Sequence, residues 1–456
     1  MMQKVSIARK IAFEALKDVM FKGKMPDEVL EGHYAQYGES LKRIDRNFAK
    51  EVTYGCLRWW SKIYWILQNT SSRKLDTCSE EVRIALVAGT YQIFYLDRVP
   101  ERAAVNESVE YVRESGQKNA VPFVNGILRQ IARRAAYFPK PDKEKAPVEY
   151  LSLQFAHPPW LVSRWLSHIH FSKLEVLLKQ CNQPPPYTVR VNSLKTPLEQ
   201  ISDFQSDLLR MERGKSDRRP LRSALHLEQA PDTSSGSIFD QGFYTIQGES
   251  SQLIAPLVQP KPGDFIVDAC AGPGGKLTHL YELGRGEIRL LATEKDPSQM
   301  RKAKENANRL GFHDIQWQEI DFLDLQPETP PDRILLDAPC SGLGVLRRHP
   351  EGKWLKTPDI IPTMAERQRK LLSHAMEILK PGGEIVYSVC SFEPEETTHQ
   401  LEWLIATYSG KIEVLSPMER LQDYYKKFVT RNDVFLVYSG NPDGMDGFGA
   451  FIIKKL

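Results

Sequence analysis

The stretch DFIVDACAGPGGKLTHLYEL, residues 264–283, combines a short apolar run, a glycine-rich turn and a helical pattern. The apolar run at 265–267 predicts a buried β-strand that ends at Asp268, and GGKLTHLYEL predicts the helix that follows it. In open α/β sheets, ligands bind outside the carboxyl ends of the strands, where such turns lie. We therefore expect the first strand, ligand-binding turn and helix of an α/β domain here.

Three glycines in the turn, Gly272, Gly274 and Gly275, would let the backbone approach a ligand closely. Their spacing, G-x-G-G-K, differs from the G-x-G-x-x-G fingerprint of dinucleotide-binding proteins and from the G-x-x-x-x-G-K-[ST] phosphate loop. The turn therefore argues against a dinucleotide or ATP as the ligand.

From residue 261 onward, strand patterns alternate with helix patterns. Strands are predicted at IRLLATE (288–294), RILLDA (333–338), GEIVYSVC (383–390), DVFLVYSG (433–440) and FGAFIIKK (448–455). Helices are predicted at DPSQMRKAKENANRLG (296–311) and TMAERQRKLLSHAMEILK (363–380). This alternation is typical of α/β proteins with a doubly wound, mostly parallel sheet.

Acidic residues follow four consecutive predicted strands: Asp268, Glu294, Asp321 and Asp337. Glu294 stands where an acidic side chain accepts the ribose hydroxyls of a nucleoside, and Asp321 is placed to meet an adenine amino group. Such a rim would repel a pyrophosphate but suits a nucleoside with a positive centre and no phosphates. S-adenosyl-L-methionine, with its sulfonium, fits that description.

The chain of 456 residues is long enough for two or three domains, and its 41% hydrophobic and 26% charged content is ordinary for a soluble protein. Its first residues lack the apolar stretch of a signal peptide, and no apolar run is long enough to span a membrane. We expect a cytoplasmic protein that does not associate with membranes and is a monomer.

Residues 1–140 carry 23 Lys and Arg against 16 Asp and Glu, whereas the rest of the chain carries 38 against 42. This basic region reads as all-helical, and EEVRIALVAGTYQIFYL (80–96) is apolar nearly all round, which predicts a central buried helix. A Pro- and Lys-rich linker follows, and residues 148–255 mix helix, strand and a polar loop at 206–220. The charge suggests contact with nucleic acid.

The six cysteines are Cys56, Cys78, Cys181, Cys270, Cys340 and Cys390. They form neither a C-x-x-C pair nor a cluster with zinc spacing, so we expect reduced thiols and no metal. Two of them follow apolar strands: Cys340 in ILLDAPCSGLG (334–344) and Cys390 in EIVYSVCSF (384–392).

DACAGPGGK (268–276), DAPCSGLGVLRRHPE (337–351) and VYSVCSFEPEE (386–396) resemble the motifs of the NOL/NOP/Sun RNA cytosine-C5 methyltransferases. RIDRNFAKEVTYGCLR (43–58) and VPERAAVNESV (99–109) resemble the NusB-like N-terminal domain of one branch. That branch is the bacterial Sun/Fmu type, ribosomal RNA small-subunit methyltransferase B. The resemblance covers nearly the whole chain.

The resemblance implies a helical NusB-like RNA-binding domain (1–140), a small α+β, RNA-recognition-like middle segment (148–255) and a Rossmann-like, doubly wound methyltransferase domain (256–456). It implies methyl transfer from S-adenosyl-L-methionine to C5 of a cytosine in 16S rRNA. Cys390 would be the nucleophile that adds to C6, and Cys340 would assist product release. The cofactor-binding residues carried over are Cys270, Ala271, Gly272, Pro273, Gly274, Gly275, Lys276, Glu294, Asp321 and Asp337.

Three positions depart from the family pattern. Glu294 stands where Asp is frequent, Val389 replaces a Thr before the cysteine, and Gly272 replaces a commoner Ala. None of these changes removes a group that the chemistry requires, so we expect an active enzyme.

For RNA, Arg347, Arg348 and Lys353 follow the Pro-Cys turn and are candidate phosphate or substrate contacts, and Arg190 and Asn192 are candidates in the middle segment. From the residues alone the order of the two thiols stays open, because DNA cytosine-C5 methyltransferases use their Pro-Cys cysteine as nucleophile. Two other functions stay open as well. One is a tRNA cytosine-C5 methyltransferase of the same family, and the other is a NusB-like RNA-binding module without catalysis.

Overall fold

The computed structural model describes residues 4–133, 141–195, 224–227, 231, 233 and 235–456. The chain divides into two compact units, which we describe separately. The helical unit comprises Met1–Gln183 and Leu346–Pro358, and the sheet unit comprises Pro184–Val345 and Asp359–Leu456. The polar loop expected at 206–220 lies outside the described residues.

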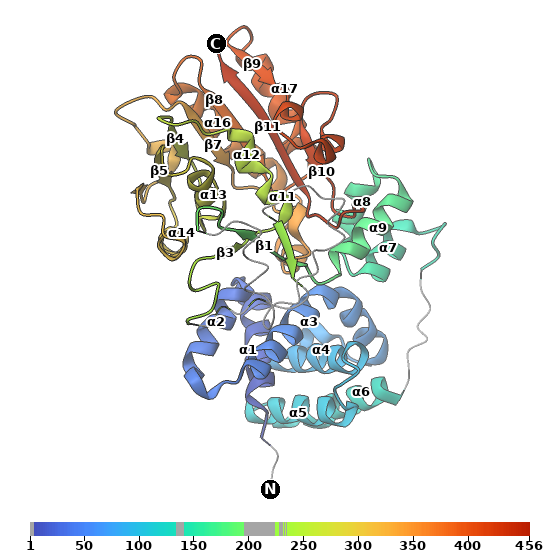
Figure 1. Cartoon of the computed structure of the whole chain (residues 1–456). Helices are drawn as coiled ribbons and strands as arrows, with labels where there is room; N and C mark the ends of the chain where they lie inside the picture. Colours follow the sequence, from blue (N-terminus) through green and yellow to red (C-terminus); the bar gives the residue numbers. More distant parts are fainter. Residues whose placement is uncertain (1–3, 134–140, 196–223, 228–230, 232, 234) are drawn as a thin grey trace. The chain divides into compact units, whose positions relative to one another are not determined.

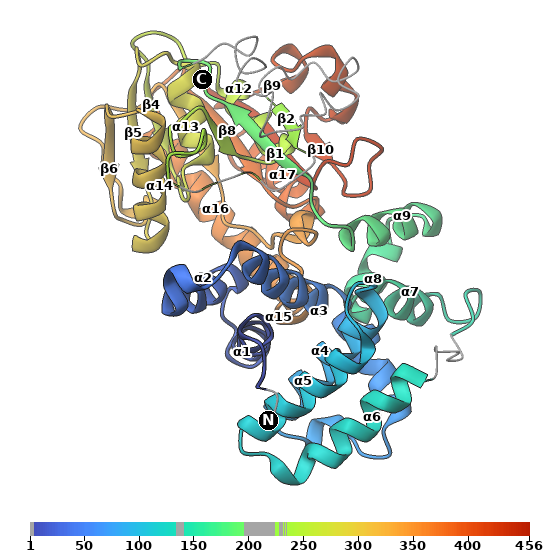
Figure 2. The same ribbon diagram turned by 60° about the horizontal axis from the view of Figure 1, so that its bottom comes forward.

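Residues 5–131 of the helical unit form a bundle around one apolar core, drawn in blue to cyan in Figures 1 and 2. The helices of the whole unit are α1 (Ile7–Lys22), α2 (Pro26–Tyr37), α3 (Arg43–Thr70), α4 (Glu80–Tyr95), α5 (Glu101–Glu114), α6 (Val121–Arg133), α7 (Pro147–Phe155), α8 (Pro159–Leu166), α9 (Phe171–Cys181) and α15 (Gly352–Leu355).

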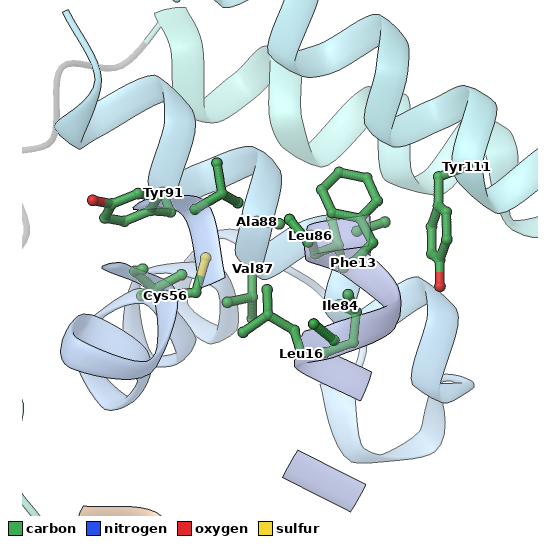
Figure 3. Close-up of a cluster of buried hydrophobic side chains, with 14 of the residues drawn as sticks. Phe13, Leu16, Cys56, Ile84, Leu86, Val87, Ala88, Tyr91 and Tyr111 are labelled. Carbon is green, nitrogen blue, oxygen red and sulfur yellow. The ribbon is translucent and has the colours of Figure 1, made fainter. Parts of the chain in front are cut away.

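Helix α4 is the centre of this bundle, which confirms the prediction made from its apolar sequence. Ile84, Leu86 and Val87 are fully buried, and Figure 3 shows them among side chains from the neighbouring helices. The ring of Tyr91 packs directly on Gly55 of α3, where a Cβ atom would lie only 2.0 Å from the ring. The glycine therefore permits the close approach of α3 and α4.

The segment 346–358 returns to the helical unit although it follows the Pro-Cys motif of the sheet unit. Trp354 Nε1 donates to the Leu57 carbonyl at 2.5 Å. The Lys353 ammonium is buried and donates to the carbonyls of Arg58 and Ala156, both at 3.3 Å, and to Asn182 Oδ1 at 2.6 Å. These bonds anchor the segment in the bundle.

The large sheet of the sheet unit has eight strands among the described residues, in the order β10-β11-β8-β7-β4-β5-β6, with β9 paired to β11. Its central strands are parallel and β9, β10 and β11 are antiparallel. The strands are β4 (Phe265–Asp268), β5 (Arg289–Thr293), β6 (Ile315–Gln318), β7 (Arg333–Asp337), β8 (Glu384–Val389), β9 (Ile412–Leu415), β10 (Phe435–Val437) and β11 (Phe448–Lys455). In Figure 1, β11 is the long red arrow.

Helices cover both faces of this sheet. Successive residues of a strand point to opposite faces, so neighbouring residues of β7 pack in two different cores. Leu335 of β7 packs in one core with α12 (Ile254–Val258), α13 (Gly275–Leu283) and α14 (Pro297–Leu310). Its neighbours Ile334 and Leu336 pack in the other, with α16 (Ile360–Ile378) and α17 (Thr398–Thr407). Figure 2 shows α13 and α14 beside β5. The doubly wound α/β fold predicted from the sequence is confirmed.

A second sheet is antiparallel and contains β1 (Tyr187–Val191) between β2 (Ala224–Leu227) and β3 (Tyr244–Ile246). Arg190 is fully buried and donates to the Gly275 carbonyl at 2.7 Å and to Thr278 Oγ1 at 2.9 Å, beside an ion pair with Glu282. Asn192 is buried too and donates to the Gly242 and Leu310 carbonyls. The expected RNA contacts of Arg190 and Asn192 are therefore wrong. Both side chains are buried, and their hydrogen bonds hold the small sheet against α13 and α14.

Candidate active site

A pocket of about 330 Å³ opens at the carboxyl ends of the parallel strands. This is the edge where ligands bind in open α/β sheets. Its lining comes from Ala269, Cys270, Gly272, Glu294, Lys295, Ile320, Asp321, Phe322, Asp337, Ala338, Pro339, Cys340, Arg367 and Cys390.

The pocket brings together seven of the site residues predicted from the sequence: Cys270, Gly272, Glu294, Asp321, Asp337, Cys340 and Cys390. The other five, Ala271, Pro273, Gly274, Gly275 and Lys276, belong to the turn and the start of α13 but do not line the pocket. Their contribution is to shape the turn. The Ala271 amide donates to Thr293 O, and Gly274 adopts φ 94° as the residue before α13.

Gly272 approaches the end of β5 closely. Its amide donates to Glu294 Oε2 at 3.1 Å, and a Cβ atom at this position would lie 2.8 Å from that oxygen and 2.6 Å from Gln299 Cβ. The second carboxylate oxygen of Glu294 accepts the Asp296 amide at 2.9 Å. The glycine and the glutamate therefore form one side of the pocket together.

Asp268 is buried behind the pocket, and among the described residues no hydrogen bond of normal geometry reaches either carboxylate oxygen. Burial and the charge of Asp337 raise the pKa of Asp268 to about 7, although Lys276 and the Cys270 amide oppose the shift. An unpaired buried carboxyl group is costly unless a positive charge or a donor approaches it. This is an environment that a cationic ligand would relieve, and the residues fit the sulfonium of S-adenosyl-L-methionine.

Asp321 lies at the start of the 3₁₀ turn Phe322–Asp324 and accepts the Leu323 amide at 3.2 Å. Arg367 Nη2 of α16 donates to it at 2.6 Å, and Lys295 Nζ is 3.8 Å away. Burial alone would raise the pKa of Asp321, but the hydrogen bonds from Arg367 and Leu323 outweigh it and lower the pKa below its usual value. Asp321 is therefore a stable anion.

Asp337 ends β7 and is held from two sides. Lys276 Nζ lies 2.5 Å from its Oδ2 atom, and Ser388 Oγ of β8 donates to Oδ1 at 2.7 Å. The Lys276 ammonium also lies over the ring of Phe448, 5.0 Å from the ring centre. The charge of Lys276, one of the cofactor-binding residues that the resemblance implies, is thus paired with Asp337.

The two thiols lie together at the edge of the pocket. Cys340 Sγ is 3.2 Å from Cys390 Sγ, and neither cysteine is in a disulfide. The hydrogen bond with Cys390, burial and the charge of Glu396 all raise the pKa of Cys340 well above its usual value. Cys340 therefore retains its proton, and the two sulfur atoms lie close enough for one thiol to donate a hydrogen bond to the other.

Sequence reasoning missed Arg367, Lys295 and Ser388, which hold the pocket carboxylates. Lys295 directly follows Glu294 and could have been found from that position. Ser388 stands near the carboxyl end of the predicted strand 383–390 and could have been found in the same way. Arg367 carries no local signal, because only packing brings α16 to this edge.

Lys353 was expected to contact RNA, and that expectation is wrong, because its ammonium is buried among acceptors of the helical unit. Arg347 and Arg348 belong to the same segment and are half-buried, and their contact with RNA stays a prediction. In the part of the chain that the structure describes, no group of three or more His, Cys, Asp or Glu residues is arranged to hold a metal ion. No helix in those ranges is both long enough and apolar enough to cross a membrane.

Models of known families match three parts of the chain. Residues 6–133 match the NusB family, residues 157–233 match the ferredoxin-like domain of RsmF/B-like methyltransferases, and residues 255–448 match the 16S rRNA methyltransferase RsmB/F.

Among curated proteins, the chain is 31% identical over 466 residues to the probable ribosomal RNA small subunit methyltransferase B of Bacillus subtilis, with 100% of both chains covered. It is 31% identical to the ribosomal RNA small subunit methyltransferase B of Proteus mirabilis, covering 86% of this chain and 90% of that protein. The crystal structure of PH0851 shares the fold, with a TM-score of 0.81, 22% identity and coverage of 99% of this chain and 100% of that one. The chain therefore belongs to the Sun/RsmB family of rRNA methyltransferases with a NusB-like N-terminal domain.

Proposed function

We propose that this protein is an S-adenosyl-L-methionine-dependent methyltransferase that modifies C5 of a cytosine in 16S rRNA through a covalent bond between Cys390 and C6 of the base. The observation that carries the proposal is the pair of thiols, 3.2 Å apart, at the edge of a pocket lined with carboxylates. A single thiol would suffice for nucleophilic attack, and the second supports a reaction that must also release its product.

When bound, S-adenosyl-L-methionine supplies the methyl group. Glu294 would hold its ribose hydroxyls, Asp321 would lie on the adenine side, and Asp268 and Asp337 would provide negative charge near its cationic centre. The fit rests on the buried, unpartnered carboxyl group of Asp268 and on the glycine turn at Gly272.

Cytosine C5 is a weak nucleophile until electron density is pushed onto it. Addition of the Cys390 thiolate to C6 breaks the C5–C6 double bond, and its electrons become available at C5 for attack on the methyl group. Afterwards a base removes the C5 proton, and its electrons re-form the double bond as the C6–S bond breaks. Cys390 then leaves as a thiolate.

Cys340 fits the second role, release of the methylated RNA. Its raised pKa keeps it protonated, so once Cys390 is a thiolate the Cys340 S–H would donate to it and stabilise the negative charge, both before attack and on departure. A protonated thiol is a weak nucleophile, which fits the supporting role of Cys340.

The target base must leave any stack before C6 can meet a sulfur atom, which costs least in single-stranded or loop RNA. We propose that the basic helical domain, residues 1–140, extends the contact over rRNA. The segment 148–255 would be a second RNA-facing domain, and residues 256–456 would be the methyltransferase domain.

The test is to incubate purified Cys340→Ala, Cys390→Ala and control Cys78→Ala variants with 16S rRNA and S-adenosyl-L-methionine. We expect a covalent protein–RNA adduct to accumulate in Cys340→Ala, none in Cys390→Ala, and normal turnover in the control, since Cys78 belongs to the helical unit and does not line the pocket. An adduct in Cys390→Ala would reverse the order of the thiols.

Bisulfite mapping of rRNA and tRNA from a deletion strain tests the substrate. Loss of one 5-methylcytosine from 16S rRNA is the expected result. Loss of 5-methylcytosine from tRNA alone would show that the substrate is tRNA rather than rRNA, and the proposed chemistry would stand. A wild-type protein that binds RNA but neither binds the cofactor nor forms an adduct would support the binding-module alternative.

A further inference from the structure

Strand pairing does not reach the two thiols. The parallel register of β7 and β8 ends at the pair Asp337 and Ser388, and the Ala338 amide then donates to the Ser388 carbonyl at 2.9 Å. Beyond the sheet, one backbone bond joins the Gly344 amide to the Cys390 carbonyl at 3.1 Å. Cys340 lies two residues after Ala338, and Cys390 lies two residues after Ser388. Contacts outside the sheet must therefore hold their sulfur atoms in place.

Glu396 bonds directly to one Cys-Ser dipeptide and reaches the other through it. Its Oε1 atom accepts the Ser341 amide at 2.7 Å, and its Oε2 atom accepts the Ser341 hydroxyl at 2.5 Å. The Ser341 hydroxyl in turn lies 3.3 Å from Ser391 Oγ, within hydrogen-bond distance. We propose that Glu396 is a positioning residue that ties the two dipeptides together and so sets the spacing of the two thiols.

The surrounding contacts hold the peptide on both sides of Cys340. Gln368 of α16 donates one amide group to Glu396 Oε1 at 3.1 Å and to the Pro339 carbonyl at 3.0 Å. Glu396 itself ends the 3₁₀ turn Pro394–Glu396, and its carbonyl accepts the Tyr387 hydroxyl at 2.8 Å. The residues before and after Cys340 are thus bonded to one rigid unit.

The choice of a carboxylate follows from the donors around it. Glu396, Ser341, Ser391 and Gln368 are all fully buried, and among the described residues Glu396 takes part in no ion pair. Burial raises the pKa of Glu396, and the hydrogen bonds from Ser341 and Gln368 oppose that shift. A carboxylate only accepts hydrogen bonds, so it can serve every one of these donors, whereas an amide would turn an NH₂ group toward one of them.

The experiment measures thiol spacing directly. Diamide removes one hydrogen atom from each of two close thiols, becomes reduced to the hydrazine, and leaves a disulfide. The Cys340–Cys390 linked peptide is quantified by mass spectrometry in the full-length wild type, in Glu396→Ala and Glu396→Gln, and in the control Glu402→Gln, whose side chain is exposed on α17.

We expect fast disulfide formation in the wild type and the control. We expect a rate about tenfold lower in Glu396→Ala and an intermediate rate in Glu396→Gln, a tenfold change corresponding to about 1.4 kcal/mol. Equal rates in the wild type and in a folded Glu396 variant would overturn the proposal, as would slow oxidation of the wild type. If circular dichroism shows Glu396→Ala to be unfolded, Glu396→Gln, which keeps the size of the side chain, decides alone.

The consequence for catalysis rests on the proposed function. Glu396→Gln should lower kcat while KM for RNA and Kd for S-adenosyl-L-methionine stay unchanged, because the pocket lining does not include Glu396. A general structural defect would change all three. Disulfide formation needs no methyl transfer, so a wild type that oxidises rapidly but does not methylate cytosine would reject the proposed function and leave the spacing role standing.

Discussion

Replacing Asp268 by Asn should stabilise the sheet unit at neutral and alkaline pH. The carboxyl group is fully buried, and its pKa in the folded protein is about 7, against 3.8 for an unperturbed aspartate. A raised pKa means that stability is fully present below pH 3.8 and is lost as the pH rises toward 7, because the unfolded chain releases the proton first. A shift of about three units corresponds to about 4 kcal/mol at pH 8.

Asn has nearly the same shape as Asp and no charge, so the stability of the Asp268→Asn variant does not fall in this way as the pH rises. We expect the stability advantage of Asp268→Asn over the wild type to grow by about 2–3 kcal/mol between pH 5 and pH 8. Hydrogen exchange of peptides that cover β4, corrected for the intrinsic exchange rate at each pH, reports opening of the sheet unit itself. The exposed Asp324→Asn serves as the control. An advantage that does not change with pH would show that Asp268 ionises normally and would refute the reasoning.

Two further substitutions test the cofactor turn and the helical unit. Gly272→Ala should weaken binding of S-adenosyl-L-methionine, measured by calorimetry, by about tenfold or more, because the new Cβ would lie 2.6 Å from a neighbouring Cβ. Gly126→Ala on α6, where no atom lies within 4 Å, should bind normally, and equal affinities in the two variants would contradict the prediction. Lys353→Met removes a buried donor that three acceptors share and should lower the stability of the helical unit by about 2 kcal/mol or more, seen as a lower Tm. Lys173 is exposed, so Lys173→Met should not change the Tm. An equally small change of Tm in the Lys353 and Lys173 variants would show that Lys353 does not anchor the segment 346–358.

Short-range patterns predicted most of the fold. The apolar run at 265–267 predicts a buried strand, and the glycines after it predict a turn. The structure has the strand Phe265–Asp268 and, after the turn, the helix Gly275–Leu283. Strand-end acids could be located in the same way, because parallel strands bring their carboxyl ends to one edge whatever the intervening helices do. Glu294, Asp321 and Asp337 accordingly line one pocket, with Asp268 buried behind it.

Charge alone was a poor guide to RNA contacts. Arg190 and Lys353 look like phosphate-binding residues in the sequence, yet both are buried against carbonyl and carboxylate acceptors. A cation in a sequence does not reveal whether its partner is solvent, a ligand or the protein's own backbone, because the acceptors come from residues far away along the chain.

The doubly wound domain, the acidic rim and the two cysteines at strand ends could be predicted from the chain alone, since each depends on local periodicity and on the register of parallel strands. Three other features depend on tertiary packing: the 3.2 Å distance between the Cys340 and Cys390 sulfur atoms, the bonds of Glu396 and Gln368 to the peptide around Cys340, and the place of the segment 346–358 in the helical unit. These features join residues from elements whose separation in the chain carries no periodic signal. They form because buried polar groups must find partners once the core has closed around them.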